Sequence, residues 1–196
     1  MKLPDTAHTT RPWRIHEIAP DFVLYDVWGL PTPGGPDDLP LLVQWFAGSD
    51  EGATRPPLVY RFLMAARWRI GAVLRWDTAE SGVGTRTPSL RDRLPADLAA
   101  GPRGPDPQTV PFTSLYQTHD EWVAEMGNRT VHGLLHLGWV PDGYGGYRGQ
   151  MAVLVKPNGW FGRLYMAAIT AFRYVLVYPA LLGMIERGWR QQLAGR

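Results

Sequence analysis

Apolar and polar side chains alternate along residues 121–156, which is the pattern of β-strands that bury one face of a sheet. The alternation comes in three runs, at residues 121–127, 130–139 and 147–156. The pair Gly127-Asn128 and the stretch PDGYGG separate these runs, and both are typical of turns between antiparallel strands. The pattern therefore predicts a meander of three consecutive antiparallel strands.

The predicted turns set the register of this meander. The first turn, two residues long, pairs Ala124 with Val131. The second turn pairs Trp139 with Tyr147. In this register the apolar side chains of all three strands share one face, which we expect to be the buried face of the sheet. The opposite face is expected to point outward and carries the polar side chains of Glu121, Glu125, Thr130, His132, His136, Arg148, Gln150 and Lys156.

Two histidines in the second run, His132 and His136, raise the question of a shared metal ion. On a helix this spacing would stack the two rings one turn apart. On the predicted strand they stand about 13 Å apart, because each residue advances ~3.3 Å. Zinc–nitrogen bonds are ~2.0–2.1 Å long, so one ion does not reach both rings. The strand favours a contact of His132 with Glu125 or Glu121 on the neighbouring strand, with a catalytic acid–base pair as the alternative.

The first third of the chain predicts one strand and one short helix. β-Formers dominate residues 23–28, where apolar and polar positions again alternate. The turn-rich stretch GLPTPGGPDD follows. It brings Asp37 or Asp38 to the N-cap of a short helix that runs to about Phe46.

Residues 58–76 predict a longer amphipathic helix, because their apolar side chains fall in one stripe and their arginines lie outside it. Residues 77–111 are rich in Pro, Gly, Ser and Thr and predict a long loop. One helical turn is expected inside this loop, with Ser89 as its cap.

Residues 164–185 are apolar almost all round and are long enough to cross a bilayer. Arg173 would then lie near the membrane centre at a cost of roughly 2.5–3.5 kcal/mol. Pro179 would free a backbone carbonyl in the same environment. The apolar face of the upstream sheet also needs a large partner. We therefore expect a long, kinked core helix that begins near Asn158 and packs on the sheet, with a membrane-anchored tail as the alternative.

The composition excludes several classes of protein. A hydrophobic fraction of 45% with nine tryptophans is incompatible with a disordered chain. The absence of cysteine excludes disulfides and thiolate chemistry, which is typical of a cytoplasmic protein. A net charge of +2 without clustered cations does not favour nucleic-acid binding. We expect a single domain over residues 13–190, with flexible tails at residues 1–12 and 191–196.

Several segments of the sequence resemble one protein family, and they do so more specifically than the order of the predicted elements does. RPWRIHEIAPDF, LPTPGGPDD and the run from NRTVHGLLHLGWV to AFRYVLVYP resemble the DUF2867 family, a bacterial family of unknown function, over residues 11–190. The order of elements is similar to the helix-grip fold of the START-like (SRPBCC) superfamily. The resemblance implies an α+β fold in which a curved antiparallel sheet wraps a long C-terminal helix around an apolar cavity. Some relatives carry a dinucleotide-binding module, but this chain has no GxGxxG motif, so we expect no cofactor.

An apolar cavity between sheet and helix predicts a module that binds a small hydrophobic molecule. Gly133 and Gly149 favour this hypothesis because they remove bulk from the apolar face. A cavity enzyme of cyclase or dehydratase type and a membrane-associated interaction protein are the alternatives, and nothing in the sequence sets an oligomeric state. The candidate lining residues, any of which can instead simply fill the core, are Tyr25, Trp122, Gly133, Leu135, Trp139, Met151, Val153, Tyr165, Ile169 and Phe172.

Overall fold

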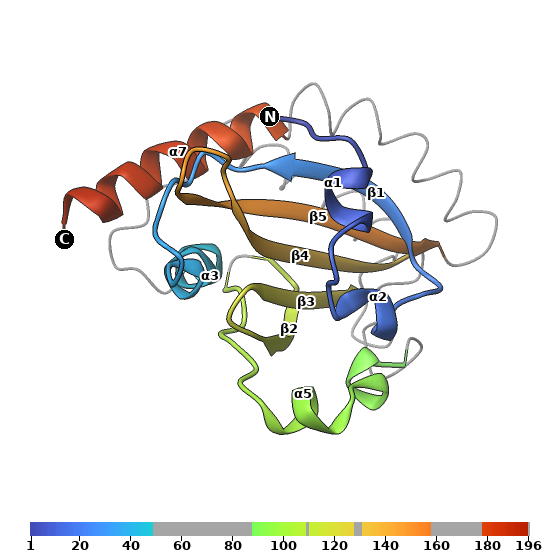
Figure 1. The fold of residues 1–196 in the computed structure, drawn as a ribbon. Helices are drawn as coiled ribbons and strands as arrows, with labels where there is room; N and C mark the ends of the chain where they lie inside the picture. Colours follow the sequence, from blue (N-terminus) through green and yellow to red (C-terminus); the bar gives the residue numbers. More distant parts are fainter. Residues whose placement is uncertain (49–87, 109, 128–130, 158–177, 196) are drawn as a thin grey trace, which may run out of the picture.

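The fold is α+β, as predicted, and is built on one antiparallel sheet of five strands (Figure 1). The strand order across the sheet is β1-β5-β4-β3-β2, so the predicted meander forms its centre. The strands are β1 (Val23–Gly29), β2 (Thr113–Gln117), β3 (Glu121–Gly127), β4 (Val131–Pro141) and β5 (Tyr147–Pro157). The computed structural model describes residues 1–48, 88–108, 110–127, 131–157 and 178–195.

The described helices are short except at the C-terminal end. They are α1 (Thr6–Thr9), α2 (Ile15–Ile18), α3 (Leu39–Ala47), the 3-10 helix η2 (Leu90–Arg93), α5 (Ala96–Ala100) and α7 (Tyr178–Ala194). The predicted helical turn in the long loop is confirmed, because the Ser89 hydroxyl accepts a hydrogen bond from the backbone N–H of Arg91 at 3.1 Å. The helix expected at residues 58–76 and the start of the C-terminal helix lie outside the described residues.

The predicted strands are confirmed, but both predicted registers are wrong. Ala124 pairs with Leu135 and not with Val131. Trp139 pairs with Gly149 and not with Tyr147. Each predicted register is shifted by an even number of residues. Because side chains alternate between the two faces with a period of two, each side chain still lies on the predicted face. The registers differ because the lengths of the turns differ from those predicted. In the first hairpin, pairing stops at Gly127, which lies opposite His132.

One strand of the sheet was missed by the sequence pattern. β2 pairs with β3 at the edge of the sheet, and its register shifts between Ser114 and Tyr116. A bulge of this kind interrupts the alternation that identifies a strand. A second irregularity lies in β1 between Leu24 and Asp26, where it turns Tyr25 and Asp26 toward the same face.

The first twelve residues, predicted to be a flexible tail, instead pack against the sheet. Lys2 forms an isolated antiparallel bridge with Trp28. The backbone N–H of Leu3 donates to the carbonyl of Val27 at 2.9 Å. Pairing with an edge strand uses backbone groups, so it leaves no signature in the side-chain pattern. The tail expected at residues 191–196 is likewise helical as far as Ala194.

Both faces of the sheet are covered, so the sheet is the middle layer of the molecule. On one face, α1, α2, η2 and α5 enclose a core with β-strand side chains (Figure 1). The buried members of this first core are Trp13, Ile15, Ile18, Ala19, Phe22, Val27, Leu90, Leu98, Leu115, Tyr116, Val123, Leu134, Val140, Ala152 and Leu154. On the other face, α3 and α7 enclose a second core. Its buried members are Trp28, Leu30, Leu39, Leu42, Val43, Trp122, Ala124, Leu137, Trp139, Met151, Tyr178, Ile185 and Trp189.

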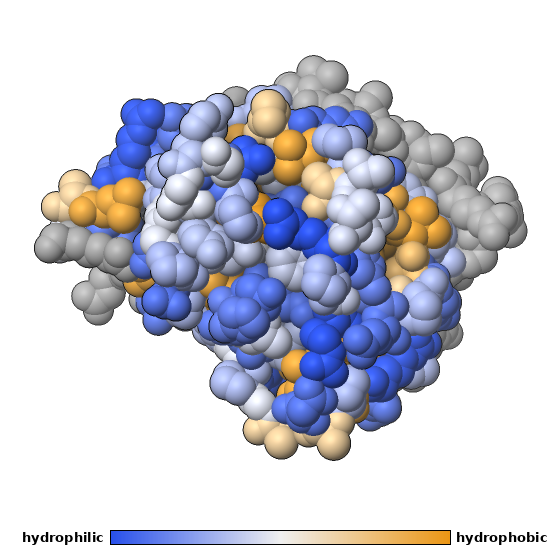
Figure 2. Space-filling model, viewed as in Figure 1, coloured by the Kyte–Doolittle hydropathy of each residue, from blue (hydrophilic) through white to orange (hydrophobic). Residues whose placement is uncertain are grey.

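The face predicted to be polar and outward is polar but buried. Four of its ionisable side chains are no more than 4% exposed, namely Glu121, Glu125, His132 and His136. The prediction was wrong because the segments that cover this face carry irregularly spaced apolar residues and show no amphipathic period. Figure 2 shows that the outer surface over α1, α2 and α5 is mostly hydrophilic, as expected of a covering layer in water.

The C-terminal helix packs closely on α3 through a glycine. A Cβ atom at Gly188 would lie 2.2 Å from Nε1 of Trp45, so the two helices approach at this point in a way that only glycine permits. Within the described residues, no helix combines the length and the apolar character needed to cross a membrane.

Candidate functional site

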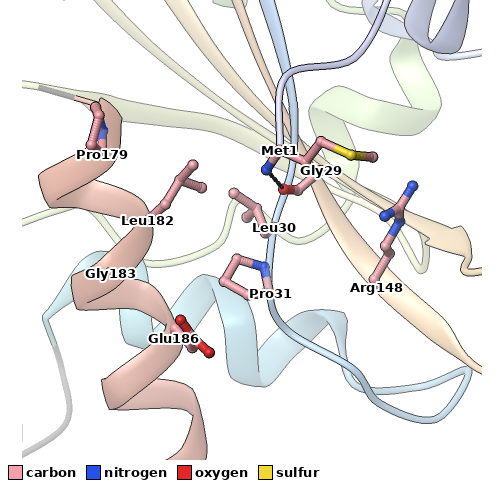
Figure 3. Close-up of a pocket in the computed structure, with 9 residues that line it drawn as sticks. All are labelled: Met1, Gly29, Leu30, Pro31, Arg148, Pro179, Leu182, Gly183 and Glu186. Carbon is pink, nitrogen blue, oxygen red and sulfur yellow. Dashed lines mark hydrogen bonds between the residues drawn. The ribbon is translucent and has the colours of Figure 1, made fainter. Parts of the chain in front are cut away.

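A groove of about 520 Å³ lies between the end of β1 and α7 (Figure 3). It is lined by Met1, Gly29, Leu30, Pro31, Arg148, Pro179, Leu182, Gly183 and Glu186. Leu30 and Leu182 point toward each other from the two sides of this groove (Figure 3). Its walls therefore come from segments that lie far apart in the sequence.

Two hydrogen bonds anchor α7, one to β1 and one to the loop that follows β1. At the start of α7, the Tyr178 hydroxyl donates to Oδ2 of Asp26 at 2.6 Å, and both side chains are buried. Further along the helix, Nε1 of Trp189 donates to the carbonyl of Pro33 at 2.9 Å. The groove residues Leu182 and Glu186 lie between these two anchors, so the helix is fixed on either side of the groove.

The local sequence explains why β1 ends at this groove. The backbone N–H of Leu30, one residue after the end of β1, still donates to the carbonyl of Gly149 in β5 at 2.8 Å. Pro31 has no N–H to donate and cannot extend the strand. The chain then turns toward α3, which leaves the Leu30 and Pro31 side chains at the groove (Figure 3).

The wall that α7 contributes to the groove has little bulk at residue 183, because glycine has no side chain. Among the described residues, a Cβ atom at Gly183 would meet only Nη1 of Arg187, at 3.5 Å. Gly183 therefore borders the groove, whereas Gly188 on the same helix provides the close contact with α3.

The two charged side chains of the groove differ in their partners. Glu186 is ion-paired with Arg190 one turn along α7. Arg148 forms no ion pair with the part of the chain that the structure describes, and its Nε is buried without a hydrogen-bond partner there. Its guanidinium lies on the backbone of Gly29, where an added Cβ atom would be 3.2 Å from Nη1. The N-terminal ammonium of Met1 also borders the groove and donates to the carbonyl of Gly29 at 2.9 Å. The groove thus combines apolar walls with a guanidinium that has no ion-pair partner among the described residues.

The candidate lining residues from the sheet share one face, as predicted, but they do not line this groove. Trp122, Trp139 and Met151 are buried in the second core. Gly149 opens no space, because a Cβ atom there would lie 2.6 Å from Cδ2 of Leu42. Gly133 has only Met126 within 4 Å among the described residues.

Three further candidates, Tyr25, Leu135 and Val153, are half-buried on the same face. The helix candidates Tyr165, Ile169 and Phe172 lie outside the described residues. A ligand cavity lined by the ten candidates therefore stays a prediction. The groove residues gave no local signal, apart from the proline that follows β1.

The expected contact of His132 with Glu125 is confirmed on the opposite face of the sheet. Nε2 of His132 lies 2.9 Å from Oε2 of Glu125, which also accepts from the backbone N–H of Leu90 at 3.1 Å. The other carboxylate oxygen accepts from the Ser89 hydroxyl. Burial raises the pKa of Glu125, but the hydrogen bonds from His132, Ser89 and Leu90 outweigh it and hold the pKa below its usual value.

A second buried pair repeats this arrangement. Nε2 of His136 lies 3.0 Å from Oε2 of Glu121, whose other oxygen accepts from the backbone N–H of Arg14 at 2.8 Å. Burial and the neighbouring Glu121 carboxylate raise the pKa of Tyr116. The two histidines of β4 thus bind separate glutamates of the neighbouring strand β3. Among the described residues, no three His, Asp or Glu side chains are placed to hold a metal ion.

His8 of α1 completes this buried cluster. Its ring stands edge-on to His136 at 4.8 Å and to His16 at 4.9 Å between centroids. Neither ring nitrogen has a hydrogen-bond partner among the described residues. Burial, followed by the proximity of His136 and His16, lowers the pKa of His8 to about 2. The ring is therefore neutral at physiological pH, and the cluster acts as a buried polar layer away from the groove.

Comparisons with known proteins give one match. The family model described as "Protein of unknown function (DUF2867)" matches residues 18–180. None of the curated proteins matches the chain. None of the solved structures matches it.

Proposed function

The chain belongs to the DUF2867 family, and we propose that this member binds a small hydrophobic molecule in the groove between β1 and α7. The observation that carries the proposal is the groove itself, whose apolar walls face each other at Leu30 and Leu182. Its volume of about 520 Å³ lies within the ~300–1,000 Å³ of small-molecule sites. Because α7 is anchored on both sides of the groove, a ligand would find the site largely preformed.

The proposal includes the helix-grip architecture of the START-like superfamily. A C-terminal helix that packs on one face of an antiparallel sheet supports it. The site differs from the cavity expected over the middle of the sheet, since it lies at the end of β1. The buried pairs of His132 and His136 do not line it, so the proposed role is binding rather than acid–base catalysis.

A graded series at Gly183 tests the proposal. Gly183→Phe places a ring at the groove, and Gly183→Ala adds one methyl group as the matched control. Both replace a helical glycine, so both are expected to keep or raise helix stability. Nile red, an uncharged dye that fluoresces in apolar surroundings, serves as the probe.

We expect Nile red to bind the natural chain and the Gly183→Ala variant with dissociation constants within about threefold of each other. The Gly183→Phe variant should bind at least about tenfold more weakly, which corresponds to ~1.4 kcal/mol. Equal binding by all three proteins, or no binding by the natural chain, would contradict the proposal. Circular dichroism and thermal melting would establish that the variants are folded.

A further inference from the structure

We propose that Arg148 makes the groove selective for amphipathic ligands that carry one anionic head group, a carboxylate or a phosphate. This inference rests on the proposed function, because it names the class of ligand for the same groove. The apolar body of such a ligand would lie between Leu30 and Leu182, and its head group would bind the guanidinium.

The charge distribution of the groove supports this assignment. The other ionic side chain of the groove, Glu186, is ion-paired with Arg190. Arg148 has no carboxylate within ion-pair distance among the described residues, so its charge is available to a ligand. An arginine stays ionised under all physiological conditions, and its planar fork matches the oxygens of a carboxylate or phosphate. The groove therefore presents a permanent cation at one border of an apolar surface.

The position of the guanidinium is built into the fold. Arg148 lies near the start of β5, and its guanidinium lies close to the Cα of Gly29 at the end of β1, where an added Cβ atom would be 3.2 Å from Nη1. A Cβ atom at residue 29 would be 3.3 Å from Cζ, so a larger residue there would push the guanidinium by a few tenths of an ångström. The backbone of Gly29 therefore restricts where the guanidinium of Arg148 can lie.

The buried Nε of Arg148 is a second sign of a missing acceptor. A buried donor that lacks a partner is costly, and a charged donor more so. An anionic oxygen bound at the guanidinium would supply hydrogen bonds that the described residues do not supply. Charge-assisted bonds of this kind are roughly twice as strong as those between neutral groups, which gives the site a reason to prefer acids over alcohols of the same length.

Three probes with the same chain separate the head group from the apolar body. Decanoate, decyl phosphate and decanol are each titrated against bound Nile red at pH 7.5, with the natural chain and with Arg148→Gln. We expect at least one of the two anions to bind the natural chain about tenfold or more tightly than decanol. In Arg148→Gln the affinities of that anion and decanol should converge to within about twofold, with decanol unchanged.

Two control variants complete the design. Arg148→Lys keeps the charge without the planar fork and should retain part of the preference. Arg91→Gln removes an exposed cation far along the chain and should leave the preference intact, which excludes a general effect of net charge. The comparison with decanol corrects for any loss of packing when the arginine stem is shortened.

The outcomes distinguish this inference from the proposed function. If Nile red and decanol bind but neither anion is preferred, the role of Arg148 is overturned. The same holds if Arg148→Gln keeps the preference. In both cases the proposal that the groove binds hydrophobic molecules is unaffected. If neither the dye nor any probe binds, both proposals are overturned together.

Discussion

Acidification should destabilise this protein through His8, and the structure gives the size of the effect. The imidazole is buried, and its pKa of about 2 compares with 6.5 for the unfolded chain. Protons therefore bind the unfolded state more tightly than the folded state. The stabilisation is complete above pH 6.5 and is lost as the pH falls from 6.5 toward 2. The expected slope is ~1.4 kcal/mol per pH unit, so the loss at pH 5 is about 2 kcal/mol from this residue alone.

The variant His8→Leu isolates this contribution. Leucine does not titrate and has a similar volume, and no hydrogen bond to the described residues is lost because both ring nitrogens of His8 lack partners there. At pH 8 we expect the variant to be as stable as the natural chain or slightly more stable. At pH 5 the variant should exceed the natural chain by about 2 kcal/mol more than at pH 8.

Urea unfolding followed by tryptophan fluorescence measures the effect at pH 8, 7, 6 and 5. With slopes of ~1–3 kcal/mol per molar urea, the relative midpoint should shift by about 1 M between pH 8 and pH 5. His119→Gln is the control, because the His119 side chain is 91% exposed and its replacement leaves the buried cluster around His8 intact. Parallel pH profiles for the natural chain and His8→Leu would refute the reasoning.

Two further substitutions test the packing of the molecule, with unfolding by urea as the measurement. Glu125→Ala removes the acceptor of three hydrogen bonds, two of them buried, and should cost about 3–5 kcal/mol. A loss below ~1 kcal/mol would show that the pair with His132 is not structural. Gly188→Ala places a methyl group against Trp45 and should cost about 1–3 kcal/mol, whereas Gly183→Ala on the same helix should be neutral or stabilising. Equal effects of the two alanines would contradict the described contact of α7 with α3.

The faces of the strands could be predicted from the sequence, but their registers could not. Alternation assigns Trp122 and Leu137 to one face and His132 to the other, and an even error in register leaves that assignment intact. The register depends on where pairing stops. Gly127-Asn128 is a plausible two-residue turn in sequence, but Gly127 is itself paired, with His132. β2 was missed because its register shifts within a strand of five residues.

The burial of the polar face and the groove escaped prediction for a different reason. Glu125 looks like a surface residue in sequence, and only the fold brings Ser89 and Leu90 to its carboxylate. The groove combines residues from both ends of the chain, such as Leu30 and Leu182, with no shared local pattern. Contacts between residues so far apart in the sequence can be identified only once the path of the folded backbone is known.

The position of a bound ligand is the most direct test of the groove. A decyl alcohol with a terminal diazirine can be bound to the full chain, activated by light, and located by mass spectrometry of the digested protein. We predict labels on residues 29–31 and 179–186, and their loss in the Gly183→Phe variant. Labels confined to the middle of the sheet, around Trp122 and Met151, would contradict the assignment of the groove as the binding site.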